Sequence, residues 1–218
     1  MDILVLGASG GIGSALSQAY ARKGQVTGLS RSGDGFDITN AASVALHLNG
    51  IGPFDRVIVA TGALEIGGHG PEKTLRKLDP AGMEAQFRLN ALGPALVLSH
   101  AHRLLPKDRP SVMAVLSARV GSIGDNNLGG WVSYRAAKAA LNQIIRTAAI
   151  ELGRSHPKAC LIALHPGTVA TPFTEKYLAR HPSMPAPEAA QNMRDVIESR
   201  TPAQSGQFFD YAGKPVLW

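Results

Sequence analysis

The sequence of 218 residues has a single cysteine, Cys160. One cysteine cannot form an internal disulfide and leaves no cysteine cluster that could bind a metal. No apolar run approaches the roughly 18 residues that a membrane-spanning helix needs. The opening residues (MDILVLG) lack the basic stretch of a signal peptide and have the pattern of a strand. We therefore expect a cytoplasmic protein with no membrane segment and no metal site.

Acidic residues are also outnumbered: 22 Lys and Arg face 16 Asp and Glu, which gives a formal net charge of +6. A basic balance could indicate nucleic-acid binding. However, the basic residues are scattered, and no run of five or six occurs. A solvated basic surface, which also suits an anionic cofactor, is the preferred interpretation, and we expect no nucleic-acid partner.

Short apolar runs alternate along the chain with segments of helical periodicity. This alternation predicts an α/β protein with a doubly wound, Rossmann-type parallel sheet of six to seven strands, as a single domain over residues 1–218. Gly93-Pro94 should kink or interrupt the helix expected at 80–105. The expected strands are 3–6, 25–30, 56–60, 111–117, 159–164 and 206–210, and the other expected helices are 12–23, 40–49, 134–154 and 187–200.

A glycine-rich turn, Gly7-Ala8-Ser9-Gly10-Gly11-Ile12-Gly13, lies between the first strand and the first helix. Backbone N–H groups and the helix dipole at such a turn face a phosphate, and the glycines let a pyrophosphate approach. The spacing is G-x-x-x-G-x-G rather than the common G-x-G-x-x-G. Its strand–turn–helix context still predicts a dinucleotide site, and a tight turn in a flavodoxin-like fold is the alternative.

The end of the second strand carries Ser30-Arg31, about 18 residues past Gly13. An NAD-binding unit places there the acid that holds the ribose 2′-OH. An acid would repel a 2′-phosphate, whereas Arg31 can pair with it through a forked, charge-assisted contact. The sequence therefore favours NADP, with NAD as the alternative. Arg31 could also be an ordinary surface arginine at a strand end, with no role in binding.

Tyr134 and Lys138 stand four residues apart, which places both on one face of a helix. An ammonium beside a phenol favours the phenolate and lowers the tyrosine pKa from its usual value near 10. Such a tyrosine can act as a general acid or base on an alcohol or carbonyl. The spacing alone is weak, because a tyrosine four residues before a lysine is common in helices.

Together these motifs resemble the short-chain dehydrogenase/reductase family over nearly the whole chain. Residues 120–126 and 206–213 look closer to the C-factor-like branch, which includes small carbonyl reductases. The matching positions are Gly7, Gly11 and Gly13 in the glycine motif, Ala60-Thr61-Gly62 at the Asn-Asn-Ala-Gly turn, Asn90, the Tyr134–Lys138 pair, and Pro166-Gly167 with Thr168 and Thr171 along the nicotinamide.

The resemblance implies hydride transfer between a nicotinamide and a small carbonyl or alcohol substrate. Tyr134 would exchange the proton of the oxygen, Lys138 would lower the Tyr134 pKa and hold the nicotinamide ribose, and Asn90 would fix a water that links Lys138 to solvent. Asp37 and Ile38 would border the adenine. The family also implies a homodimer or homotetramer. The implied cofactor-binding set is Gly7, Ser9, Gly11, Ile12, Gly13, Arg31, Asp37, Ile38, Ala60, Thr61, Gly62, Asn90, Tyr134, Lys138, Pro166, Gly167, Thr168, Val169 and Thr171.

One departure from the family bears on activity. The family's second serine at the end of the fifth strand hydrogen-bonds the substrate oxygen, and that position is Ala118 here. Loss of one such donor costs on the order of 100-fold in rate. Ser117 should point the other way by strand alternation, and Ser122 could bend back from the loop. A dinucleotide-binding sensor or signalling protein with weak or no catalysis is therefore the alternative function.

Other departures concern the rim of the site. The Asn-Asn-Ala-Gly turn reads Val59-Ala60-Thr61-Gly62, which removes a bracing amide. Only five residues separate Arg31 from Asp37, so we expect one βα crossover to be missing or vestigial and the adenine to be more exposed. The segment 164–187 is short for a substrate lid, which suggests an open pocket that Trp131, Phe173 and Tyr177 could line.

Overall fold

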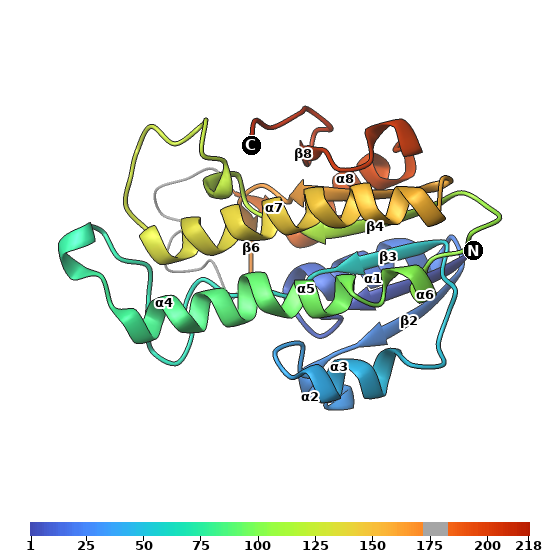
Figure 1. Ribbon diagram of the computed structural model, residues 1–218, viewed down its shortest axis with the longest axis horizontal. Helices are drawn as coiled ribbons and strands as arrows, with labels where there is room; N and C mark the ends of the chain where they lie inside the picture. Colours follow the sequence, from blue (N-terminus) through green and yellow to red (C-terminus); the bar gives the residue numbers. More distant parts are fainter. Residues whose placement is uncertain (172–182) are drawn as a thin grey trace.

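A computed structural model describes residues 1–171 and 183–218. Six parallel strands form one sheet in the order β2-β1-β3-β4-β5-β8 (Figure 1). This order confirms the predicted doubly wound α/β fold. The strands are β1 (Asp2–Leu6), β2 (Gln25–Leu29), β3 (Arg56–Val59), β4 (Ser111–Leu116), β5 (Ala159–His165) and β8 (Phe208–Asp210), and a separate parallel pair is β6 (Val169–Ala170) with β7 (Met184–Pro185).

Alternate residues of each strand enter two cores on opposite faces of the sheet. One core packs Met113 and Leu161 of the strands against Leu141 of α7 (Val132–Ser155). The other packs neighbouring strand residues against α1 (Gly11–Ala21) and α8 (Ala186–Glu198). The helices α3 (Ala41–Leu48), α5 (Gly93–Leu98) and α6 (Ala101–Leu104) lie on the face that α7 covers (Figure 1).

The chain between β2 and β3 contains only helices, namely α2 (Arg31–Asp34) and α3. Asn40 caps α3 by accepting hydrogen bonds from the N–H groups of Ala42 and Ser43. No strand lies between α2 and β3, and β2 forms the edge of the sheet. The prediction that one βα crossover is vestigial is confirmed.

The helix expected at 80–105 is divided into several pieces. A π-helical turn (Arg88–Leu92) joins α4 (Pro80–Phe87) to α5 directly before Gly93-Pro94. Pro94 has no N–H to donate to the carbonyl of Asn90, four residues earlier, which explains the irregular turn at this point. Short 3-10 turns occur at Leu75–Lys77, Arg119–Gly121 and Pro202–Gln204.

Within residues 1–171 and 183–218, no helix is both long enough and apolar enough to cross a membrane. The same part of the chain contains no cluster of three or more His, Cys, Asp or Glu side chains that could hold a metal ion.

Candidate active site

The Tyr134–Lys138 pair lies in the first two turns of α7, beside the C-terminal end of β4. The Lys138 ammonium is 5.9 Å from the centroid of the Tyr134 ring, within the range of a cation–π contact. Lys138 is buried, and its Nζ donates a hydrogen bond to the carbonyl of Leu116 at 3.1 Å. The helical spacing therefore brings the two side chains together as the sequence predicts.

The protonation of this pair differs from the sequence expectation. Burial raises the pKa of the Tyr134 phenol above its usual value, and burial lowers the pKa of the Lys138 ammonium to about 8. Removal from water disfavours the charged form of both groups, and this effect exceeds the attraction between ammonium and phenolate. The predicted depression of the Tyr134 pKa is thus wrong for the protein alone, because helical spacing does not reveal burial.

Asn90 lies close to Lys138, and Gly62 packs between the two side chains. A Cβ atom on Gly62 would lie 2.8 Å from Asn90 Oδ1 and 3.5 Å from Lys138 Nζ, so only glycine fits between them. The Asn90 side chain is fully buried; its Nδ2 donates to Ala63 O at 2.8 Å and to Gln86 Oε1 at 2.6 Å. Gln86 in turn donates to Leu64 O at 2.8 Å. These two amides brace the segment after β3, where the family's asparagine turn is missing. The i,i+4 spacing of Gln86 and Asn90 is the sequence feature from which their contact could have been predicted.

Glu72 is a residue of the site that the sequence analysis missed. Its carboxylate accepts hydrogen bonds from the hydroxyl of Ser133 and, at 3.3 Å, from the Ser133 backbone N–H. Its carbonyl accepts the N–H of Trp131 at 2.5 Å, which holds Trp131 in a left-handed conformation with φ of 54°. Glu72 thereby caps the N-terminus of α7, one residue before Tyr134.

Replacing Glu72 by alanine should remove this cap and loosen the turn that carries Tyr134. We expect the free energy of unfolding to fall by about 1–2 kcal/mol and kcat to fall more than KM rises. Urea unfolding and steady-state kinetics measure the two effects. Lys73→Ala, at an exposed neighbouring position, is the matched control; equal effects of both variants would contradict a specific capping role.

A pocket of about 440 Å³ opens beside Tyr134. Its lining confirms that Trp131 faces this space, whereas Phe173 and Tyr177 lie outside the described residues. Of the expected cofactor residues, it gathers Ile12, Tyr134 and those that follow β5. Its lining residues are Ile12, Leu64, Ser117, Ala118, Arg119, Val120, Leu128, Gly129, Trp131, Tyr134, Arg135, His165, Pro166, Gly167, Thr168, Val169 and Thr171.

Ala118 lies in this pocket without a hydroxyl, and its serine neighbours are engaged elsewhere. The Ser117 hydroxyl donates to Asn142 Oδ1 at 2.6 Å, which agrees with the expected strand alternation. The Ser122 oxygen accepts the N–H of Asp125 at 3.1 Å, and Ser122 is not among the residues that line the pocket. Neither hydroxyl is therefore directed at a substrate beside Tyr134.

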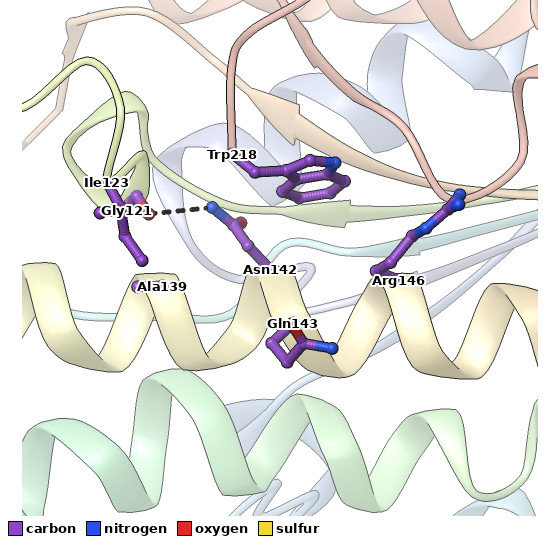
Figure 2. A pocket seen from close by; sticks show the side chains of 7 residues that line it. All are labelled: Gly121, Ile123, Ala139, Asn142, Gln143, Arg146 and Trp218. Carbon is purple, nitrogen blue, oxygen red and sulfur yellow. Dashed lines mark hydrogen bonds between the residues drawn. The ribbon is translucent and has the colours of Figure 1, made fainter.

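A smaller pocket of about 230 Å³ lies on another side of α7, between that helix and the C-terminal Trp218 (Figure 2). Asn142 points into it and donates from Nδ2 to the carbonyl of Gly121 at 3.2 Å. Since Asn142 also accepts the Ser117 hydroxyl, it fixes the backbone on both sides of Ala118. The second pocket thus lies beside a residue, Asn142, that supports the active site.

The glycine turn, the end of β2 and the segment after β5 converge at one edge of the sheet. The Ser32 hydroxyl donates to the Ser9 hydroxyl at 3.1 Å, which joins the glycine turn to the helix that begins at Arg31. A Cβ atom on Gly11 would approach the Thr171 Cγ2 to 2.7 Å, so the segment that contains Thr171 covers this turn. Open sheets of this kind bind ligands outside the carboxyl ends of their strands.

Asp34 changes the interpretation of the β2 end. Although Ser30-Arg31 carries no acid, the Asp34 carboxylate folds back and accepts hydrogen bonds from the Ser30 backbone N–H at 2.8 Å and the Ser30 hydroxyl at 3.2 Å. The end of β2 therefore has a carboxylate beside it in the fold, although the residues at the strand end, Ser30 and Arg31, include no acid. The pair Ser30-Arg31 alone does not show this contact, because the helical turn Arg31–Asp34 returns the Asp34 side chain to Ser30.

The residues present fit an adenine dinucleotide. Thr61 Oγ1 is buried and has no hydrogen-bond partner among the described residues, and its methyl group lies against Gly7, where a Cβ atom would come within 3.1 Å. Asp37 Oδ1 accepts from Thr39 N and Oγ1. Ile38 is 5 % exposed and packs on Gly93, so its side chain belongs to the core and only its backbone can border an adenine.

Comparison with known proteins agrees with this geometry. The sequence profile of the family described as enoyl-(acyl carrier protein) reductase matches residues 37–208. The C-signal protein of Myxococcus xanthus is 36 % identical over 148 residues, which are 66 % of this chain and 83 % of that protein. The 1-hydroxy-2-glutathionyl-2-methyl-3-butene dehydrogenase of Rhodococcus sp. (strain AD45) is 29 % identical over 233 aligned positions, which cover 99 % of each chain.

Among solved structures, a short-chain dehydrogenase/reductase from Burkholderia multivorans with bound NADP superposes with a TM-score of 0.82 at 26 % identity, over 100 % of this chain and 99 % of that one. The profile match covers most of the chain, and the strand order and the Tyr134–Lys138 geometry agree with it. The chain therefore belongs to the short-chain dehydrogenase/reductase family of oxidoreductases.

Proposed function

We propose that this protein is an NADP-dependent oxidoreductase that interconverts a small carbonyl compound and the corresponding alcohol. The observation that carries the proposal is the Tyr134–Lys138 pair, of which Tyr134 lines the 440 Å³ pocket together with Ile12 of the glycine turn. A bound nicotinamide supplies the hydride in reduction and accepts it in oxidation. The cofactor would be held by the glycine turn (residues 7–13), Arg31, residues 37–38 and 60–62, Asn90, and the Pro166-to-Thr171 segment.

Tyr134 supplies the proton chemistry. Its raised pKa keeps the phenol protonated at neutral pH, which suits donation of a proton to the carbonyl oxygen as hydride reaches the carbon. In the reverse direction the phenol must first lose its proton before Tyr134 can accept the proton of the alcohol, so the raised pKa favours reduction at neutral pH. Lys138, with a pKa of about 8, can return a proton to Tyr134 and hold a ribose hydroxyl. Asn90 would position a water near Lys138; its side-chain amide is engaged with Ala63 and Gln86, so we assign that task to its backbone carbonyl.

Fluorescence titration with NADPH and NADH, followed by a panel of ketones, aldehydes and quinones, tests the proposal. We expect tight NADPH binding and oxidation of NADPH by at least one carbonyl class. Binding without turnover on the whole panel would favour the second candidate, a dinucleotide-binding sensor, which Ala118 motivates.

Arg31 should determine the choice between the two cofactors. We expect Arg31→Ala to weaken NADPH by about tenfold, the value of one charge-assisted contact, and NADH by less than about twofold. Asp34→Asn is the matched control at the same strand end: it keeps Arg31, removes a negative charge, and should leave NADPH binding unchanged or tighter. Equal weakening of NADPH and NADH by Arg31→Ala would refute a contact with the 2′-phosphate.

We also propose that the protein forms a homodimer or homotetramer, as the family resemblance implies, through the helices that contain Asn90 and Tyr134. Analytical ultracentrifugation gives the mass directly, and a monomer at micromolar concentration would contradict this assembly.

A further inference from the structure

We propose that the preferred substrate carries a carboxylate in addition to its carbonyl or alcohol group, and that Arg119 recognises that carboxylate. The inference rests on the proposed function, because it concerns the substrate of the same pocket. Arg119 directly follows Ala118 and begins the 3-10 turn Arg119–Gly121, and its side chain lines the pocket that Tyr134 lines.

The Arg119 guanidinium is ordered by an ion pair that engages only one of its three nitrogens. Its Nε pairs with Asp125 Oδ2 at 2.5 Å, and the side chain remains 55 % exposed. Its two terminal nitrogens make no hydrogen bond to any residue in the described part of the chain. A guanidinium offers its N–H groups as a flat fork, and a carboxylate can take two of them in parallel. Because Asp125 orders the side chain, less conformational entropy is lost when an anion binds.

The charge of the lining favours an anion. Arg119, Arg135 and His165 line the pocket, and no Asp or Glu is among its described lining residues. The buried acid Asp210 is not a lining residue, although its charge acts on Arg119 and His165 from behind the wall; its Oδ1 accepts the N–H groups of Ala212 at 3.0 Å and Lys214 at 2.9 Å. A carboxylate in the pocket would therefore meet cationic and neutral groups without a competing carboxylate on the wall.

His165 adds a neutral hydrogen-bonding group to the same wall. Burial, assisted by the charge of Arg119, lowers the pKa of His165 to about 4. Its Nδ1 is buried and has no partner among the described residues, so the ring proton is better placed on Nε2. The imidazole thus offers one N–H donor at neutral pH, while Arg119 supplies the positive charge.

Arg135 has a different role although it also lines the pocket. Its Nε donates to Gly130 O at 2.9 Å and its Nη1 to Val120 O at 3.2 Å. These bonds fix the loop before α7. Much of the remaining wall is apolar, with Ile12, Leu64, Val120 and Leu128. The lining therefore favours a substrate with an apolar body, an oxygen that Tyr134 can protonate and an anionic end that Arg119 can bind.

The test uses a series of oxo acids and their methyl esters, with one to five carbons between the carbonyl and the carboxyl group. We expect the wild-type protein with NADPH to reduce the best acid at least about tenfold faster, in kcat/KM, than its ester. Arg119→Gln should abolish this preference. Asp125→Asn breaks the same ion pair but keeps the cation, so it should retain the preference. Arg103→Gln, at a distant exposed position, should change nothing.

Calorimetric titration of the same oxo acids onto the protein with NADP⁺ bound, a mixture that cannot transfer hydride, measures recognition without turnover. Loss of acid binding in Arg119→Gln, but not in Asp125→Asn, supports the inference even when turnover is slow. Equal handling of acids and esters by the wild type, or equal effects of the two variants, overturns it and leaves the proposed function intact. Binding of the acids through Arg119 with no reduction of any carbonyl would instead refute the proposed function.

Discussion

Replacing Tyr134 by phenylalanine is expected to lower kcat/KM for carbonyl reduction by about 1,000-fold, the middle of the range for general acid catalysis. The ring and its contact with Lys138 remain, and only the hydroxyl that donates the proton is removed. NADPH affinity should stay within about threefold, because most of the proposed cofactor contacts lie along the glycine turn and the Pro166 segment. Stopped-flow NADPH oxidation and fluorescence titration measure the two quantities.

Tyr211→Phe is the control for this experiment. The Tyr211 ring packs against Gly167, where a Cβ atom would lie 2.8 Å from its Cδ1 atom, but Tyr211 does not line the main pocket. Its loss of a hydroxyl should leave turnover nearly unchanged. Turnover that survives Tyr134→Phe would show that another group supplies the proton, and the proposed mechanism would fail.

Restoring a hydroxyl at position 118 should have the second largest effect, in the opposite direction. We expect Ala118→Ser to raise kcat by on the order of 100-fold for a neutral ketone, which is the value of one preorganised hydrogen bond to the reacting oxygen. The physical reason is that Ser117 donates to Asn142 and Ser122 accepts from Asp125, so neither polarises the substrate.

Ala118→Val is the matched control, since it adds volume at the same place without a donor, and it should not raise kcat. If Ala118→Ser also left kcat unchanged, the wild-type pocket would already contain an effective donor. His165 and Arg119 are then the groups to examine, because both line the pocket.

The fold could be predicted from the sequence because its signals are local. The strand–glycine–helix start and the alternating apolar runs each involve neighbouring residues, and the structure contains both. The missing βα crossover could also be predicted, because the five residues between Arg31 and Asp37 are too few to form a helix and a strand. The π-helical turn was indicated by Pro94, although its form was not.

The missed features depend on contacts between distant parts of the chain. Glu72 meets Ser133 across 61 positions, and Asn142 meets Ser117 across 25. No periodicity relates such pairs; the loop conformations that join them arise only when the sheet and α7 are assembled. The predicted lowering of the Tyr134 pKa was wrong for a related reason. Burial is a property of the whole fold, and its effect on the pKa exceeded that of the nearby ammonium.

The most direct measurement of the central claim is the transfer of deuterium from NADPH labelled at C4 of the nicotinamide. Single-turnover mixtures of the protein, labelled cofactor and each carbonyl compound would be analysed by mass spectrometry. The account predicts one deuterium on the carbinol carbon of at least one product, with the rate at which it appears reduced about 1,000-fold in Tyr134→Phe. Tight binding of NADPH with no deuterium in any product, in the wild type and in Ala118→Ser alike, would contradict it.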